Sequence, residues 1–166
     1  PVLVEPVGNG YVQINPTWPP ATQQEMDSFW DLPFTKLPHP RYKGKHIPAF
    51  EMIKFSINTH RGCFGGCNFC TIAAHQGKFI QSRSEESIIK EITALNALPG
   101  FAGNISDVGA PTANMYGMRG KNPELCAKCR RKSCLFPVPC KNMDRSHERL
   151  LKLYERIAAV KGIRHA

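Results

Sequence analysis

The chain has 166 residues, of which 42% are hydrophobic and 21% are charged, so it is long and apolar enough to form one folded domain with a buried core. This composition excludes a disordered chain, and no apolar run approaches the about 20 residues of a membrane span. Seven cysteines, an odd number, and the lack of a secretory signal argue against a disulfide-bonded secreted protein and favour the cytoplasm. Neither end resembles a natural terminus, since the chain opens on Pro1, so we expect a fragment of a larger protein.

Positive charge is concentrated in one part of the chain. From Arg119 to Arg164 there are thirteen Lys or Arg against four Asp or Glu, an excess equal to the whole net charge of +9. Such a stretch could attract nucleic acid. It could equally be a basic loop followed by a solvated helix face, and both interpretations stay open.

Residues 1–51 contain nine of the fourteen prolines, and we expect this region to be mostly an extended, proline-rich arm or linker. One short helix is predicted from Thr22 to Trp30, because Thr22 is a suitable N-cap and Glu25 follows three residues later. The two tryptophans, Trp18 and Trp30, are expected to anchor the arm to the neighbouring core.

Residues 52–166 show the order of elements that is typical of an α/β fold. Met52–Thr59 alternates apolar and polar side chains and is predicted to be a strand. A helix is predicted after the N-cap Ser84, ending at Pro99-Gly100, and a second strand over 104–109. Strand, helix and strand make a βαβ unit, whose strands should be parallel.

Three further features complete the expected elements. A short helical turn is predicted over 69–75, and residues 79–83 should be extended or irregular. The helix after Ser84 carries an apolar stripe of Ile88, Ile92 and Leu95. A last helix is predicted over 146–161, with Gly162 as its stop.

Cys63, Cys67 and Cys70 form a C-x3-C-x2-C run in a glycine-rich loop directly after the first strand. Three thiolates on one loop can hold three irons of a [4Fe–4S] cubane, which normally has four cysteine ligands, so one iron would be free for another ligand. Glycines suit such a loop because they accept positive φ. Two alternatives stay open, half of a zinc site and inert thiols.

A second cysteine group lies in the basic segment 119–144, which we expect to be an insertion between the second strand and the last helix. Its spacing is C-x2-C-x4-C-x5-C. The group could bind zinc or an auxiliary iron–sulfur cluster, since four sulfurs suit both, or it could be free thiols in a loop. The possible second metal site consists of Cys126, Cys129, Cys134 and Cys140.

The C-x3-C-x2-C run, with an aromatic residue before its last cysteine, resembles the signature of the radical S-adenosylmethionine (SAM) superfamily. Other stretches extend the resemblance in the same linear order, so that residues 26–166 together are similar to the YgiQ-type group of that superfamily. These stretches are 32–35, 39–40, 47–54, 61–67, 81–85, 105–107 and 111–116.

The resemblance implies cofactors and residue roles. Cys63, Cys67 and Cys70 would bind the cluster, whose open iron chelates SAM, and Phe69 would lie against the SAM adenine. Gly109, Ala110, Pro111 and Thr112 stand where related enzymes have a Gly-Gly-Glu-type motif facing the SAM amino group. Here Ala110 replaces the second glycine and no glutamate follows, which weakens that assignment. No catalytic residue is assigned.

The resemblance also implies a reaction and a fold. One electron, from a donor such as flavodoxin or ferredoxin, would split SAM to methionine and a 5′-deoxyadenosyl radical that abstracts hydrogen from an unknown substrate. The fold would be an incomplete (β/α) barrel of the partial TIM-barrel type, with about two βα units present, so the fragment alone should be inactive.

A binding module is the alternative function. In it Cys67 and Cys70 pair with Cys126 and Cys129 around zinc, and the basic region contacts nucleic acid. This alternative leaves Cys63 without a role.

Overall fold

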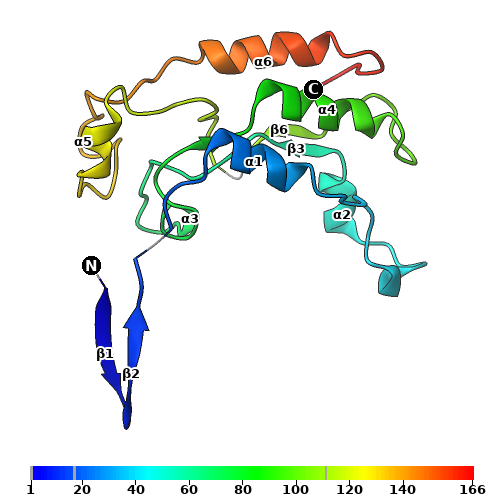
Figure 1. Ribbon diagram of the computed structural model, residues 1–166. Coiled ribbons are helices and arrows are strands. Elements are labelled where there is room, and N and C mark those ends of the chain that lie inside the picture. Colours follow the sequence, from blue (N-terminus) through cyan, green and yellow to red (C-terminus); the bar gives the residue numbers. More distant parts are fainter. Residues whose placement is uncertain (1, 17, 111) are drawn as a thin grey trace.

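The computed structural model describes residues 2–16, 18–110 and 112–166. Two short parallel strands lie at its centre, β3 (Ser56–Asn58) and β6 (Asp107–Gly109), with Ile57 opposite Val108. Helix α4 (Glu85–Leu95) lies between these strands in the sequence. The predicted α/β class and the parallel βαβ unit are therefore confirmed (Figure 1).

Helix α4 begins and packs as its sequence predicts. The Ser84 hydroxyl accepts a hydrogen bond from the Ser87 amide at 3.1 Å, which caps the helix. Ile88, Ile92 and Leu95 are fully buried and belong to the same apolar cluster as the central strands. Removing these side chains from water is the main source of stability for this part of the fold.

Helix α4 ends at Leu95, before the predicted stop at Pro99-Gly100. The side-chain amide of the next residue, Asn96, donates to the carbonyl of Lys161 at 3.1 Å. Gly162 follows with φ +93°, and a Cβ there would lie 2.3 Å from Asn96 Oδ1. The end of α4 is thus fastened to the chain that follows the last helix.

Helix α6 (Glu148–Ala158) confirms the predicted last helix with shorter bounds. Leu150, Leu153 and Ile157 are buried in the cluster that also holds α4 and the central strands. Figure 1 shows α6 and α4 on the same side of these strands.

The predicted strand Met52–Thr59 is too long. Helix α2 (Pro48–Ile53) occupies its first part, and Ile53 is 63% exposed instead of lying on a buried face. Proline favours the first turn of a helix, because its fixed φ suits that position and its missing N–H would have no partner there. Only Ser56–Asn58 is extended, with Ile57 buried.

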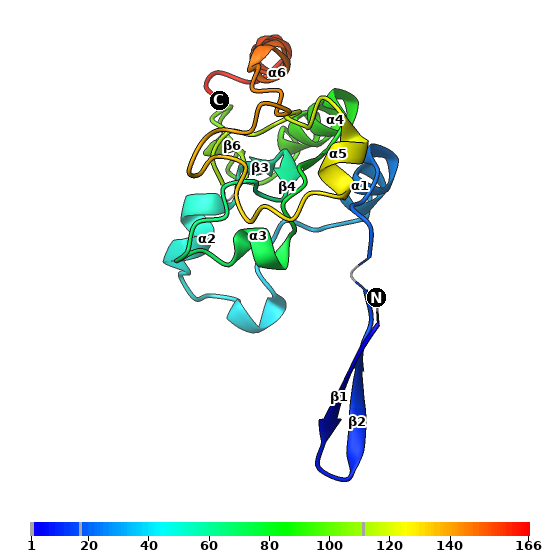
Figure 2. The same cartoon turned by 90° about the vertical axis from the view of Figure 1, so that its left-hand side faces the viewer.

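The N-terminal region has more structure than an extended arm. Strands β1 (Leu3–Val7) and β2 (Gly10–Ile14) form an antiparallel hairpin, exposed along its whole length. Figures 1 and 2 show it projecting away from the rest of the molecule. Helix α1 (Gln23–Trp30) follows and is confirmed, with Thr22 and Glu25 forming a capping box.

Only one of the two tryptophans anchors the arm. The Trp30 ring centroid lies 4.8 Å from the guanidinium carbon of Arg83 and 5.2 Å from that of Arg61. These distances are within the range of cation–π attraction. Trp18 is 93% exposed, so its predicted anchoring role is wrong.

The remaining elements are short. A 3-10 turn (Pro40–Tyr42) lies before α2, and β4 (His60–Arg61) pairs antiparallel with β5 (Gln81–Ser82). Helix α3 (Ile72–His75) confirms the predicted helical turn, and α5 (Pro123–Ala127) lies in the basic segment. In the described part of the chain the sheets are all two-stranded and none closes into a barrel. No helix among those residues is long and apolar enough to span a bilayer.

Candidate cofactor site

The cysteine loop, residues 61–70, starts at the carboxyl end of the parallel strand pair. The Thr59 amide and hydroxyl both donate to the Gly109 carbonyl, at 2.7 Å and 3.1 Å, and so tie the end of β3 to the end of β6. The carboxyl ends of parallel strands are the usual place for ligand sites in open α/β sheets. The loop therefore lies where the sequence predicts a site.

Two glycines of the loop are required by its conformation. Gly62 has φ +89° and Gly66 has φ +62°, values that other residues rarely adopt. A Cβ on Gly62 would lie 2.0 Å from the Phe79 carbonyl oxygen, and one on Gly66 would lie 2.3 Å from that of Lys132. The loop is thus held against two other backbone segments and is not simply a flexible turn.

Gly65 lies beneath two of the three candidate ligand sulfurs. A Cβ at this position would lie 3.3 Å from Cys63 Sγ and 3.6 Å from Cys67 Sγ. The Gly65 amide also donates to Cys63 Sγ at 3.4 Å, a contact of the kind that tunes cluster potentials. The sulfurs of Cys63 and Cys67 therefore share one space that a larger side chain would fill.

The three thiols of the cysteine loop differ in their exposure. Cys67 is exposed, whereas Cys63 and Cys70 are partly buried, and all three are free. Across residues 2–16, 18–110 and 112–166, no three His, Cys, Asp or Glu side chains are gathered as ligands of a single ion. A cubane gives each thiolate its own iron. The three free thiols are the soft sulfur donors that such a cluster takes.

His60 is a buried polar residue next to the loop. Its Nδ1 lies 2.9 Å from the Thr59 hydroxyl, and its Nε2 lies 3.3 Å from the Thr112 hydroxyl. Burial lowers the pKa of His60 to about 4, so the ring is neutral at pH 7. His60 thus joins the cysteine loop to the segment after β6 through uncharged hydrogen bonds.

The predicted SAM-contacting residues fall at two places. Phe69 is 91% exposed at the tip of the loop. Gly109 is buried at the end of β6, Ala110 and Thr112 follow it, and Pro111 lies outside the described residues. The structure brings Thr112 to His60.

The second cysteine group packs directly on the first. The Cys134 amide donates to the Phe64 carbonyl at 2.9 Å, next to the close approach of Gly66 to Lys132. An apolar cluster joins the two groups. It contains Phe64, Met115, Met118 and Met143, with Cys63, Ile80, Cys134 and Cys140 against it.

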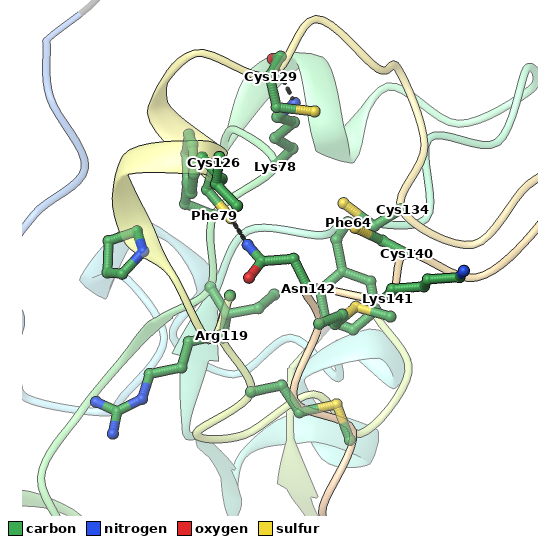
Figure 3. Close-up of a pocket in the computed structure, with 16 residues that line it drawn as sticks. Phe64, Lys78, Phe79, Arg119, Cys126, Cys129, Cys134, Cys140, Lys141 and Asn142 are labelled. Atoms are coloured by element: carbon green, nitrogen blue, oxygen red, sulfur yellow. Dashed lines mark hydrogen bonds between the residues drawn. The ribbon is translucent and has the colours of Figure 1, made fainter.

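All four cysteines of the second group line one cavity of about 470 Å³. In Figure 3, Cys134 and Cys140 lie together, Cys126 is beside Asn142, and Cys129 is near Lys78. Burial raises the pKa of the Cys134 thiol, Lys78 opposes this, and the other three cysteines add to it. Each of the other three thiols is therefore close enough to act electrostatically on Cys134.

Several basic residues in and near the basic stretch have partners of their own. Lys78 Nζ donates to the carbonyls of Cys129 and Arg131, each at 3.0 Å. The Arg131 guanidinium donates to the Phe136 and Val138 carbonyls. In α6, Arg156 pairs with Glu85 and Glu86 of α4. Part of the basic stretch thus serves the fold itself.

Sequence reasoning missed the contact between the two cysteine groups and the role of Arg83. Arg83 is fully buried, and its guanidinium donates to the Asn58 carbonyl at 2.8 Å and forms an ion pair with Glu91. A lone arginine after an extended segment gives no sign of this position.

Comparison with known proteins places the chain in a family. A family model described as Radical SAM N-terminal matches residues 1–56, so it covers the proline-rich region and ends before Cys63. The chain is 54% identical over 162 residues to a UPF0313 protein of Bacteroides thetaiotaomicron, which is 98% of this chain and 26% of that protein. It is 52% identical over 163 residues to the UPF0313 protein YgiQ of Escherichia coli strain K12, covering 98% and 22% respectively.

A third relative agrees with these two. The UPF0313 protein of Porphyromonas gingivalis is 51% identical over 155 residues, which is 93% of this chain and 24% of that protein. The chain thus spans about a quarter of the length of these curated relatives. No solved structure matches it. The resemblance inferred from the sequence is confirmed.

Proposed function

We propose that this chain, which belongs to the UPF0313 proteins and carries a Radical SAM N-terminal domain, contributes the cofactor-binding loop of a radical SAM enzyme. In that enzyme Cys63, Cys67 and Cys70 hold three irons of a [4Fe–4S] cluster. When bound, the cluster supplies the electron that cleaves SAM to methionine and a 5′-deoxyadenosyl radical, which abstracts hydrogen from a substrate. Because the chain spans about a quarter of its relatives, the activity is proposed for the full-length protein.

The space above Gly65 is the observation that carries this proposal. The Cys63 and Cys67 sulfurs face a position where even one methyl group would touch both. Gly62 and Gly66 hold the loop through close backbone contacts on either side, so this space is formed before a ligand enters. A preformed, thiol-lined space at the end of β3 supports cluster binding over inert thiols.

SAM binding is proposed for Phe69 within the loop and for the segment that follows β6. Phe69 presents an exposed aromatic ring on which an adenine could stack. The segment after β6 reaches the start of the loop through Thr112 and His60, and the backbone carbonyls of Ala110 and Thr112 could accept from the SAM amino group. His60 holds this segment in position while remaining neutral.

The remainder of the enzyme is proposed on the family relationship. The parallel β3–β6 pair would be the start of a partial barrel that further βα units complete. A small electron carrier such as flavodoxin or ferredoxin would reduce the cluster, in the cytoplasm, where thiols stay reduced. The substrate-selecting wall would come from the other three quarters of the protein.

The alternative of a zinc-bound nucleic-acid module finds less support. It needs Cys67 and Cys70 to share one ion with Cys126 and Cys129, and the described part of the chain holds no such group. Cys126 and Cys129 line the cavity of the second group, whereas Cys67 and Cys70 do not.

The test uses the full-length protein reconstituted anaerobically with iron and sulfide. After reduction with dithionite in the presence of SAM, we expect 5′-deoxyadenosine by liquid chromatography. The C63A/C67A/C70A variant should lose this product while keeping the far-ultraviolet circular dichroism of the wild type. An intact cluster that yields no 5′-deoxyadenosine would falsify the proposed function.

A further inference from the structure

The four cysteines of the second group lie in a lobe, residues 119–144, whose two ends are joined at its base. Its neck is made by Lys121, whose amide donates to the Asn142 carbonyl at 2.6 Å, and by Asp144, whose amide donates to the Arg119 carbonyl at 2.9 Å. A bridge between Gly120 and Met143 lies between these bonds. The lobe is therefore held together at its base and pressed against the first cysteine loop at its other side.

Within this lobe the sulfurs surround a space. The cavity of about 470 Å³ has four cysteines in its wall, and most of its other lining is apolar, including Phe64, Phe79 and Met118. Figure 3 shows the four side chains distributed around this cavity. A structural zinc ion is bound by four ligands at about 2.0–2.3 Å, so it does not require a cavity of this size between them.

The Cys126 sulfur packs against Gly120 in the neck of the lobe. The Cys63 and Cys67 sulfurs pack against Gly65 in a similar way. A Cβ on Gly120 would lie 2.2 Å from Cys126 Sγ, so glycine is needed for the thiol to lie there. The Asn142 side-chain amide also donates to that sulfur at 3.2 Å. A sulfur that accepts an amide hydrogen is the arrangement that stabilises a charged thiolate ligand.

Positive charge surrounds the same space. Lys78, Arg119 and Lys141 contribute to the cavity lining. Lys78 is fixed there by its bonds to the carbonyls of Cys129 and Arg131. Four thiolates with their metal carry net negative charge, which these cations would offset.

We propose that Cys126, Cys129, Cys134 and Cys140 bind a second iron–sulfur cluster, separate from the one proposed for the first loop. All four cysteines line the same cavity, and a polynuclear centre takes one thiolate per iron. The Cys134–Phe64 hydrogen bond and the Gly66–Lys132 contact then make the filled lobe a support for the first loop. This inference stands on the lobe alone and does not depend on SAM cleavage.

The experiment counts iron, sulfide and zinc in the full-length protein after anaerobic reconstitution. The chain's seven cysteines divide completely between the two groups. A variant with all seven changed to serine therefore measures the metal bound elsewhere in the protein, which is subtracted. We expect about eight irons and eight sulfides per wild-type chain, because each cubane holds about four.

Two group variants separate the sites. C63A/C67A/C70A should keep about four irons with the broad visible absorption of a cluster, and C126S/C129S/C134S/C140S should also keep about four. A wild-type count of about four irons overturns the proposal without reference to any variant. A measured content of one zinc per chain in C63A/C67A/C70A also overturns the proposal. Circular dichroism of each variant shows whether a lost cluster reflects lost folding.

Discussion

The amide of Cys134 donates a hydrogen bond to the carbonyl of Phe64 at 2.9 Å, which joins the two cysteine groups through their backbones. On the neighbouring residues, Gly66 and the Lys132 carbonyl come so close that no side chain fits between them. The first loop therefore takes its shape partly from a segment far along the sequence. Substitutions in one cysteine group should therefore change the conformation of the other.

Gly66→Ala should destabilise the protein and lower iron binding by the first loop. The residue has φ +62°, a conformation that costs other residues about 1–2 kcal/mol, and the new Cβ would lie 2.3 Å from the Lys132 carbonyl oxygen. Gly77→Ala is the matched control, because Gly77 has φ +85° with open space around its Cβ position. Urea unfolding should show a clearly larger decrease in the free energy of unfolding for G66A than for G77A. Equal decreases would mean that the contact with Lys132 is unimportant.

Gly65→Val tests the sulfur cradle without backbone strain. Gly65 is not among the residues with positive φ, so the backbone accepts a side chain. Valine would nevertheless fill the space between the Cys63 and Cys67 sulfurs. We expect a urea midpoint close to that of the wild type together with a several-fold loss of 5′-deoxyadenosine formation. Unchanged product formation in G65V would show that the cluster lies elsewhere.

Local signals predicted the regular elements well. Ser84 and Thr22 announce helix starts through side-chain chemistry that needs no tertiary context, and both caps are formed. The stripe of Ile88, Ile92 and Leu95 likewise identified the buried face of α4. Where sequence and structure differ, as at Ile53, the helix begun by Pro48 outweighs the strand-like alternation that follows.

Long-range contacts could not be predicted from the sequence. The cysteine spacing identifies two candidate sites, but nothing in it indicates that Cys134 contacts Phe64. The hairpin of β1 and β2 is a local feature, and it was missed because the prolines of residues 1–51 suggested an irregular arm. Its strands contain Pro6 alone, and proline is tolerated in an edge strand such as β1.

Arg83→Met should lower the free energy of unfolding by about 1–3 kcal/mol, because it leaves buried carbonyls without their donor, while Lys36 still pairs with Glu91. Glu91 has only 12% side-chain exposure, and the variant also loses the bonds to the Asn58 and Ser87 carbonyls. The double variant R83M/E91Q should be no more stable than R83M, because Glu91→Gln removes the remaining ion pair with Lys36. Urea denaturation checks both, and a double variant clearly more stable than R83M would contradict this account.

Phe69→Ala should weaken SAM binding without affecting the fold. The ring is 91% exposed, so its removal creates no cavity. Aromatic stacking on a base contributes about 1–3 kcal/mol, which corresponds to about 5- to 150-fold in affinity. Equilibrium dialysis of SAM against the reconstituted full-length protein measures the change, and F69Y should restore binding. Wild-type affinity in F69A would remove Phe69 from the proposed SAM site.

His60 should make the protein less stable as the pH falls below neutrality. Burial holds its pKa at about 4 in the folded protein, whereas the unfolded chain takes up a proton near the usual value of 6.5. The unfolded state therefore binds more protons between these values, and stability falls by about 2 kcal/mol from pH 7.5 to pH 5. H60Q lacks this titration, so its free energy of unfolding should fall by about 2 kcal/mol less over the same pH range. Urea unfolding is measured in the C63A/C67A/C70A background, so that loss of the first cluster in acid cannot contribute. If the free energy of unfolding falls equally with and without His60, the His60 ring is not buried as described.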